Sequence, residues 1–237
     1  KPGTTAVTYP VNAAVDAVYR EICAERGAVW RGAAFDTLQE RAHSLAGQRF
    51  DYKDEKDLTL HLLGEHQLRN AALAIETVSV LREKGWNIPE SALREGLSAA
   101  RWEARFELLR ADPPVIADGG HNMSGIDSLI EILNELDCKV IGIVGMVRGK
   151  DVKYAAERLS GILDAAICAD GYIDNNIPSA ELKDYFTCPC EAMDYKNAIE
   201  RAVGVAEERN AAVLICGSLY LASAVRREFI SFDKGRL

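Results

Sequence analysis

The sequence of 237 residues lacks the two glycine-rich patterns that most often hold nucleotide phosphates. No G-x-x-x-x-G-K-[ST] loop is present. The segment GMVRGKD follows its Gly-Lys with Asp151, which offers no hydroxyl to a magnesium ion. No G-x-G-x-x-G follows an apolar run. A complete phosphate cradle is therefore excluded within these residues.

Long apolar runs and basic stretches are missing too. No run approaches the ~18 residues of a membrane helix, and the opening KPGTTAVTYP has no apolar signal-peptide core. We therefore expect a cytoplasmic protein without a membrane partner. The net charge is -8 and no basic stretch stands out, which argues against nucleic acid as a partner. An anionic ligand would need local basic groups and helix N-termini.

Paired metal-binding cysteines are scarce. The six cysteines are scattered, and several lie in apolar runs such as AVLICG, a pattern typical of buried thiols in a cytoplasmic chain. Cys188 and Cys190 form a C-P-C segment, but no second ligand pair has a suitable spacing. We expect no metal site there.

The composition is that of an ordinary globular protein, and the pattern of expected strands and helices changes along the chain. Up to about residue 104, short strands are expected at TAVTYP, AVWRG, QRFDY and LTLHLLG, with helices over 12–26, from 65, and over 89–99. Asn12 and Gly27 are the expected cap and stop of the first helix. This part has few strands and no obvious closed core, so we expect it to be incomplete by itself.

After residue 104, short apolar runs alternate with helical patterns over 124–136, 151–163, 179–185, 195–209 and 219–229. Such alternation predicts an α/β fold with a mostly parallel sheet covered on both faces. We therefore predict two domains, residues 1–104 and 105–237.

The segment VIADGGHNMSG places Asp118, two glycines and His121 at the end of an apolar run, with Ser124 at the expected helix cap. Ligands of open α/β sheets gather at such strand ends. Glycines allow close approach, and the helix N-terminus suits a phosphate or carboxylate. His121 can donate to an anion or transfer a proton. The alternative is a capping turn with a surface histidine.

Three further polar segments are expected at the same edge of the sheet. Arg105 precedes the strand before Asp118, Lys150 follows the next strand, and Ser218 lies at the last strand-to-helix turn. Each has a structural alternative: Arg105 and Lys150 can be surface residues, and Ser218 can be a helix cap. Their coincidence at presumed strand ends favours a binding site.

Several segments, in order, resemble the folylpolyglutamate synthase / dihydrofolate synthase family of the Mur ligase superfamily. LLGEHQLRNAALA resembles its G-x-H-Q-x-x-N-A-x-x-A segment and WEARFELL its W-P-G-R-x-E segment. IADGGHN is similar to D-G-A-H-N, VRGKDV to the D-K-D turn, and CGSLYLAS to the final G-S-L-Y. The chain departs at Glu103–Ala104, Gly120 and Gly149, where the family has Pro-Gly, Ala and Asp.

The resemblance implies a C-terminal Rossmann-like domain over residues 105–237, preceded by the second part of a Mur ligase-type α/β ATPase domain over 1–104. The family's phosphate loop and magnesium ligands would precede residue 1. ATP and Mg²⁺ are the implied cofactors. ATP, glutamate and a folate or pteroate are the implied small-molecule substrates, joined through an acyl phosphate.

Residue by residue, the resemblance implies that Asn70 contacts adenine, Arg105 the phosphates and Asp118 the nucleotide. His121 would face the reacting centre with Lys150 assisting.

By the same resemblance Ser218 would hold glutamate. Two other functions stay open: another Mur-type amino-acid ligase, or a non-catalytic binding or assembly module. We expect the 237-residue chain alone to be inactive.

Overall fold

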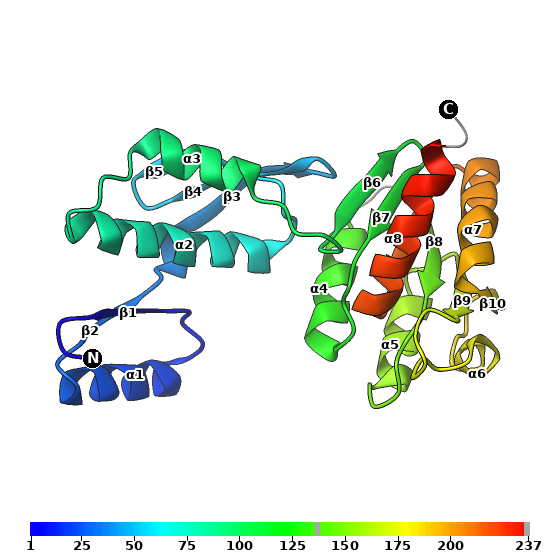
Figure 1. The fold of residues 1–237 in the computed structure, drawn as a ribbon, viewed down its shortest axis with the longest axis horizontal. Helices are drawn as coiled ribbons and strands as arrows, with labels where there is room; N and C mark the ends of the chain where they lie inside the picture. Colours follow the sequence, from blue (N-terminus) through cyan, green and yellow to red (C-terminus); the bar gives the residue numbers. More distant parts are fainter. Residues whose placement is uncertain (136–137, 235–237) are drawn as a thin grey trace. The chain divides into compact units, whose positions relative to one another are not determined.

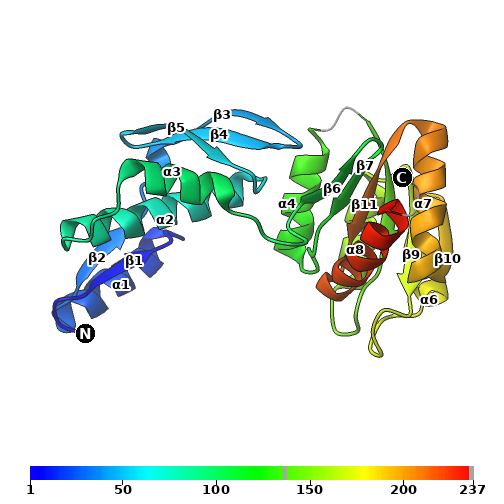
Figure 2. The ribbon, with the colours of Figure 1, turned by 45° about the horizontal axis from the view of Figure 1, so that its top comes forward.

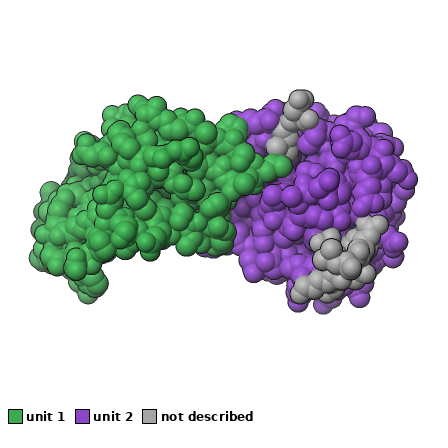
Figure 3. Space-filling model, turned by 90° about the horizontal axis from the view of Figure 1, so that it is seen from above, with its two compact units in different colours: residues 1–101 green, residues 102–237 purple. Residues whose placement is uncertain are grey.

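The computed structural model describes residues 1–135 and 138–234, and the side chains of 1–135 and 138–230. The chain forms two compact units, residues 1–101 and residues 102–237 (Figures 1 and 3). None of the described helices is both long and apolar enough to cross a membrane.

The first unit begins with a βαβ arrangement. Strands β1 (Thr5–Thr8) and β2 (Val29–Gly32) pair in parallel, and helix α1 (Ala13–Glu25) connects them. The Asn12 side chain accepts a hydrogen bond from Val15 N at 3.0 Å, and Gly27 has φ of +63°. The predicted cap and stop are therefore confirmed, because each residue satisfies the backbone at its end of the helix.

The rest of this unit is an antiparallel sheet with two helices. After a short 3-10 helix, η1 (Phe35–Thr37), come β3 (Leu38–Ser44), β4 (Gly47–Tyr52), β5 (Glu55–Leu60), α2 (Glu65–Glu83) and α3 (Glu90–Ala99). The strand order is β3-β4-β5. We did not predict β3, because its exposed polar residues carry no hydrophobic alternation.

A hydrophobic core joins β4 and β5 to α2 and α3. Alternate residues of the two strands point to one face of the sheet, which the helices cover. The core comprises Phe50, Tyr52, Leu58, Leu60, Leu68, Ala71, Ala72, Ile75, Leu93 and Leu97. The expectation that this part has no closed core is therefore wrong.

The second unit is built on a six-stranded sheet of order β10-β9-β8-β11-β7-β6. Its strands are β6 (Glu107–Ala111), β7 (Pro114–Ala117), β8 (Lys139–Val144), β9 (Ala165–Asp170), β10 (Cys190–Asp194) and β11 (Ala211–Cys216). Only β6 runs antiparallel to its neighbour. The predicted mostly parallel sheet is confirmed. Edge strand β10 was not predicted, because most of its residues are exposed.

Helices cover both faces of this sheet (Figures 1 and 2). They are α4 (Met123–Leu133), α5 (Val152–Ser160), α6 (Ser179–Lys183), α7 (Tyr195–Arg209) and α8 (Leu219–Lys234). α7 and α8 share one core cluster with alternate strand residues such as Ile141 and Ile143. α4 and α5 pack on each other outside that cluster and cover the opposite face.

One helix boundary differs from the prediction. Helix α4 begins at Met123, and its cap is Asn122, whose side chain accepts from Gly125 N at 2.8 Å. Ser124, the predicted cap, lies in the first turn and donates to Asn122 Oδ1 at 3.3 Å. Asn122 has the extended backbone that a cap requires, so the prediction was two residues late.

Candidate functional site

Backbone hydrogen bonds join three strand ends into one continuous edge. Asp118 N donates to Ile215 O at 2.8 Å, and Gly217 N donates to Gly120 O at 3.1 Å. Gly145 N, after β8, donates to Cys216 O at 3.2 Å. The turns that follow β7, β8 and β11 therefore lie together, as expected for the carboxyl edge of a parallel sheet.

Asp118 organises this edge through both of its carboxylate oxygens. Oδ1 accepts from Gly120 N at 2.6 Å, and Oδ2 accepts from Phe106 N at 2.8 Å. Hydrogen bonds to a charged acceptor are stronger than those between neutral groups. The carboxylate therefore holds both its own turn and the loop before β6.

The loop around Arg105 has an unusual backbone. Ala104 and Phe106 have φ of 54° and 45°, in the left-handed region that residues other than glycine rarely adopt. Gly119 N donates to Ala104 O at 2.8 Å, and Ala104 N donates to Glu107 Oε2 at 2.9 Å. Such backbone persists only where surrounding bonds impose it, so the position of Arg105 is imposed by the turn beside it.

The Arg105 guanidinium lies against Gly119 of that turn. A Cβ built on Gly119 would stand 3.3 Å from Arg105 Nη1 and 2.6 Å from Leu219 Cδ1. Arg105 is partly buried, and no described residue forms a hydrogen bond or ion pair with its guanidinium. By contrast, Arg148 pairs with Glu181 at 3.0 Å. Within the described part of the chain, the edge therefore presents a cation that forms no ion pair with a carboxylate.

His121 stands directly before the cap of α4. Its Nδ1 lies 2.9 Å from Gly119 O. A carbonyl oxygen only accepts, so Nδ1 carries the proton in this hydrogen bond. In the neutral ring Nε2 is then an unprotonated acceptor, and in the charged ring it is a second donor. The turn thus orients the ring and leaves Nε2 for another partner.

Ser218 caps helix α8, which was the structural alternative to a binding role for this residue. Its side chain is buried, with 1% of the residue exposed, and Oγ accepts from Tyr220 N at 3.2 Å. Gly217 before it has φ of +92°, and a Cβ there would stand 2.7 Å from Gly145 O. The close approach of the two turns therefore requires glycine at this position.

The other two predicted site residues, Lys150 and Asn70, are not among the residues that join these turns. Lys150 is exposed in the turn before α5, and no described residue bonds its side chain. Asn70 is exposed on α2, in the first unit, and donates from its amide to Gln67 Oε1 at 3.2 Å. The second unit thus brings together Arg105, Asp118, His121 and Ser218.

Tyr172 is a residue of this edge that the sequence analysis missed. Its ring lies against Gly145, where a Cβ would stand 2.7 Å from Tyr172 Cε1. Burial raises the pKa of its hydroxyl above the usual value. Its place just after the apolar run AAICAD was a usable signal, because that run also ends at the carboxyl edge.

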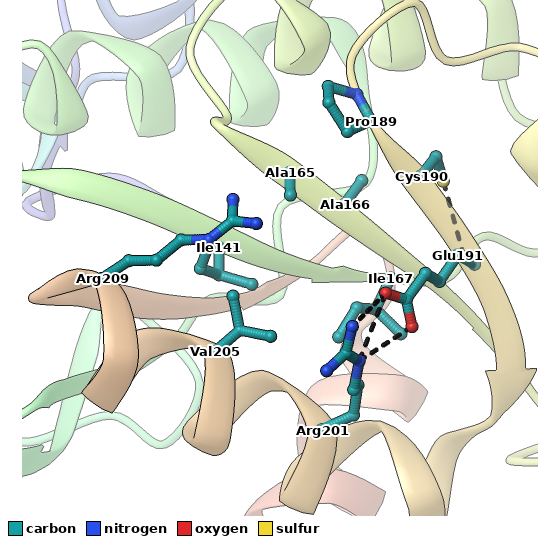
Figure 4. A pocket seen from close by; sticks show the side chains of 10 residues that line it. All are labelled: Ile141, Ala165, Ala166, Ile167, Pro189, Cys190, Glu191, Arg201, Val205 and Arg209. Atoms are coloured by element: carbon teal, nitrogen blue, oxygen red, sulfur yellow. Dashed lines mark hydrogen bonds and ion pairs between the residues drawn. The ribbon is translucent and has the colours of Figure 1, made fainter.

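Two small hollows lie elsewhere. One, of about 260 Å³, is lined by Phe35, Leu38, Glu40, Glu65, Leu68 and Arg69, without Asn70. The other, of about 90 Å³, lies between α7 and strands β8 to β10, beside the Glu191–Arg201 ion pair (Figure 4). Ligand pockets commonly measure about 300–1,000 Å³, so neither hollow accommodates a nucleotide by itself.

A metal site of this chain is not found among its described residues. They contain no group of three or more His, Cys, Asp or Glu side chains arranged to hold a metal ion. The described residues therefore supply no preformed cluster of metal ligands.

The joined turns at the carboxyl edge of a doubly covered, mostly parallel sheet define the second unit as an open α/β domain of the kind that binds ligands at its strand ends. Residues 104–219 match the family described as the Mur ligase, glutamate ligase domain. Similarity to curated proteins extends further along the chain. The chain is 32% identical over 201 residues to folylpolyglutamate synthase of Lacticaseibacillus casei. It is 31% identical over 194 residues to dihydrofolate synthase/folylpolyglutamate synthase of Bacillus subtilis (strain 168). The chain belongs to this folylpolyglutamate synthase and dihydrofolate synthase family of Mur ligases.

Each comparison covers most of this chain but only about half of the relative. The two alignments cover 78% and 77% of this chain but only 44% of each relative, so the chain spans less than half of their length. The apo form of L. casei FPGS is 28% identical with a TM-score of 0.78, over 97% of this chain and 54% of that one. A Mycobacterium tuberculosis folylpolyglutamate synthase complexed with ADP and AMPPCP has the same fold, at 22% identity, TM-score 0.82 and coverage of 96% and 55%.

Proposed function

We propose that this chain provides the glutamate ligase domain and part of the ATP-binding domain of a ligase that joins glutamate to a folate or to dihydropteroate. In this reaction ATP phosphorylates the substrate carboxylate, the amine of glutamate attacks the acyl phosphate, and phosphate leaves. The observation that carries the proposal is the Arg105 guanidinium, partly buried beside the Asp118 turn with no described anionic partner.

Phosphoryl transfer depends mainly on positioning and on stabilising charge. Arg105 supplies a cation whose loop is held by Asp118 Oδ2 through Phe106 N at 2.8 Å. The N-terminus of α4 adds backbone N–H groups to the same edge. In this proposal Arg105 contacts the nucleotide phosphates and Asp118 both contacts the nucleotide and keeps Arg105 in place.

His121, in its charged form, is proposed to donate from Nε2 to the reacting centre. Its Nδ1 is engaged by Gly119 O at 2.9 Å, so only Nε2 can reach an acyl phosphate or the tetrahedral species that follows. Ser218 is proposed to hold glutamate. Its hydroxyl is buried and caps a helix, so it is less accessible than His121. Lys150, exposed in its turn, is proposed to assist.

One further role is proposed for a residue of the first unit. Asn70 is proposed to contact adenine, and among the described residues its exposed amide is hydrogen-bonded only to Gln67. The complex of the M. tuberculosis enzyme with ADP and AMPPCP supports ATP as the nucleotide of this family. Mg²⁺ would be held by residues other than those described here.

The test is ATP-dependent incorporation of labelled glutamate into a folate and into a pteroate by the ligase that contains this chain. Arg105→Ala should lower kcat/KM for ATP by roughly 10²–10³, the effect of removing one charge-stabilising donor in other enzymes. Arg148→Ala is the matched control, because Arg148 pairs with Glu181 on the surface. Equal activity of both variants would refute the role of Arg105.

The non-catalytic module is distinguished by a separate observation. The coding DNA upstream of Lys1 should encode a G-T-x-G-K-G-[ST] loop if the protein is a ligase. A start codon adjacent to the codon for Lys1 would favour the module instead. The purified 237-residue chain should show no glutamate incorporation, because it has no phosphate loop.

A further inference from the structure

Two thiols meet where edge strand β10 pairs with β9 in the second unit's sheet. Cys168 lies within β9, and Cys190 is the first residue of edge strand β10. Their sulfur atoms are 3.4 Å apart. This distance is too long for a disulfide and matches a thiol hydrogen bond, so the two residues form a reduced pair in contact.

The strand register explains how the two sulfurs meet. Cys168 is paired with Ala192, and Cys190 with Ala166. Because side chains alternate along a strand, Cys190 and Ala192 point to the same face as Cys168. The two cysteines are therefore diagonal neighbours on one face, and their side chains reach toward each other along the strands.

The surroundings make the two thiols unequal. Cys168 is fully buried, whereas Cys190 is partly exposed at the sheet edge. The hydrogen bond from Cys168 lowers the pKa of Cys190 to about 7, with a further contribution from the positive charge of Lys183. The same contact and burial raise the pKa of Cys168. Cys190 is thus the more acidic thiol of the pair, and the one that ionises first.

We propose that Cys190 and Cys168 form a reversible dithiol site at this edge, with a small organic disulfide as its oxidant. Cys190 is the accessible thiol that reacts first, and Cys168, in contact behind it, resolves the mixed disulfide. This site is independent of the proposed ligase function, because none of its residues belongs to the Asp118 edge.

The exchange balances in two steps. Cys190 S⁻ attacks the disulfide RSSR, a Cys190–SR bond forms, and RS⁻ leaves and takes up the proton that Cys190 had lost. This removes the thiolate charge and the hydrogen bond that raise the pKa of Cys168. Cys168 then attacks Cys190 Sγ, a Cys168–Cys190 bond forms, and a second RS⁻ leaves with the Cys168 proton. The protein loses two hydrogen atoms, and RSSR becomes two RSH.

The diagonal placement of the two cysteines also determines how easily a disulfide between them is reduced. Diagonal neighbours on adjacent strands are farther apart than opposed pairs, so closing the bond requires β10 to shift against β9. β10 is an edge strand with one described neighbour in the sheet, which makes such a shift feasible. A disulfide that departs from relaxed geometry is more easily reduced. We therefore expect a bond that a small thiol removes readily.

The experiment uses the full chain with Cys138→Ser, because Cys138 is exposed and would otherwise react with the same reagent. The protein is incubated with oxidised glutathione, alkylated, and analysed by intact mass and peptide mapping. The expected product has lost two hydrogen atoms and carries a Cys168–Cys190 link. Addition of reduced glutathione should return the starting mass.

Three variants separate the roles. Cys168→Ser should stop at the glutathionyl adduct on Cys190, and Cys190→Ser should leave Cys168 unmodified. Cys188→Ser is the matched control and should form the internal bond as before. Circular dichroism verifies that each variant folds. If one does not, peptide mapping of the chain that keeps both cysteines still decides. An unmodified pair, a stable adduct without the internal bond, or a Cys188–Cys190 link would overturn the proposal.

Discussion

Phe106 N donates a hydrogen bond to Asp118 Oδ2 at 2.8 Å, and this bond fastens the loop before β6 to the turn after β7. Oδ1 of the same carboxylate accepts from Gly120 N at 2.6 Å. Asp118 is therefore a support of the local backbone as well as the proposed nucleotide contact. A substitution there has to be tested for both effects.

Asp118→Ala should lower the free energy of unfolding by about 1–3 kcal/mol, because two backbone donors lose their acceptor. In the ligase that contains this chain it should also weaken the use of ATP. Asp118→Asn keeps one acceptor oxygen and should lose less stability. Urea unfolding of the three proteins, together with the apparent KM for ATP, measures both effects. Unchanged stability of the alanine variant would contradict the support role.

Ala104→Gly should change stability by less than about 0.5 kcal/mol, although Ala104 is buried. Release of left-handed strain contributes about 1–2 kcal/mol, and this offsets the lost methyl burial and the added chain entropy. Ala72→Gly is the matched control, because Ala72 is equally buried but lies inside helix α2. It should lose about 1.5–2 kcal/mol. Thermal unfolding of both variants tests the difference, which should vanish if Ala104 is unstrained.

His121→Ala should reduce kcat more than it raises the KM for ATP, by roughly 10²–10³ if Nε2 stabilises the charge of the reacting group. His121→Asn separates catalysis from turn formation. Its amide can replace the Nδ1 donor to Gly119 O, which lies at 2.9 Å in the native turn, but it has no group at Nε2. We expect the asparagine variant to keep the melting temperature and lose turnover. Normal turnover of either variant at saturating substrates would exclude the catalytic role.

Asp51 should make the first unit sensitive to acid. The hydrogen bond from Arg41, with a second from the Asp57 backbone, lowers the pKa of Asp51 from 3.8 to about 2. A carboxyl group with a depressed folded-state pKa stabilises the fold above its unfolded pKa. That contribution is lost as the pH falls from 3.8 to about 2.

Unfolding of the chain and of Asp51→Asn at several pH values measures this effect. The difference in stability between the two proteins should be constant above about pH 5 and should shrink below it. Glu55→Gln offers a control carboxyl group on the neighbouring strand. A difference that stays constant down to the lowest pH would show that Asp51 does not titrate with folding.

Residues 102–237 should fold when expressed alone. They contain the six-stranded sheet and core residues on both of its faces, and their length suffices for an independent core. A single cooperative thermal transition with retained α/β circular dichroism is the expected result. Noncooperative melting of this segment would mean that its stability depends on the first unit.

Several elements could be read directly from the sequence. Asn12 and Gly27 bound α1 as predicted, because capping depends on residues adjacent in the chain. The alternation of buried strands and helices after residue 104 likewise predicted the mostly parallel sheet. The roles of the predicted site residues stay predictions, although four of them lie at one edge of this unit.

Strands at sheet edges escaped prediction for a common reason. β3 and β10 expose most of their side chains, so neither shows the hydrophobic alternation of a half-buried strand. Both exist because a neighbouring strand supplies hydrogen-bond partners. The closed core of the first unit was missed too, because too few strands were expected in its sheet.

By itself the sequence determined the fold class, the position of the Asp118 turn and the family, since these follow from periodicity and from local motifs. Only the tertiary structure decided that Ala104 and Phe106 adopt left-handed backbone, that Arg105 lies against Gly119, and that Cys168 meets Cys190. Each of these depends on groups distant in the chain that are held by hydrogen bonds or by strand register. Such contacts leave no periodic trace in the sequence, because the free energy that imposes them exists only after the sheet has formed.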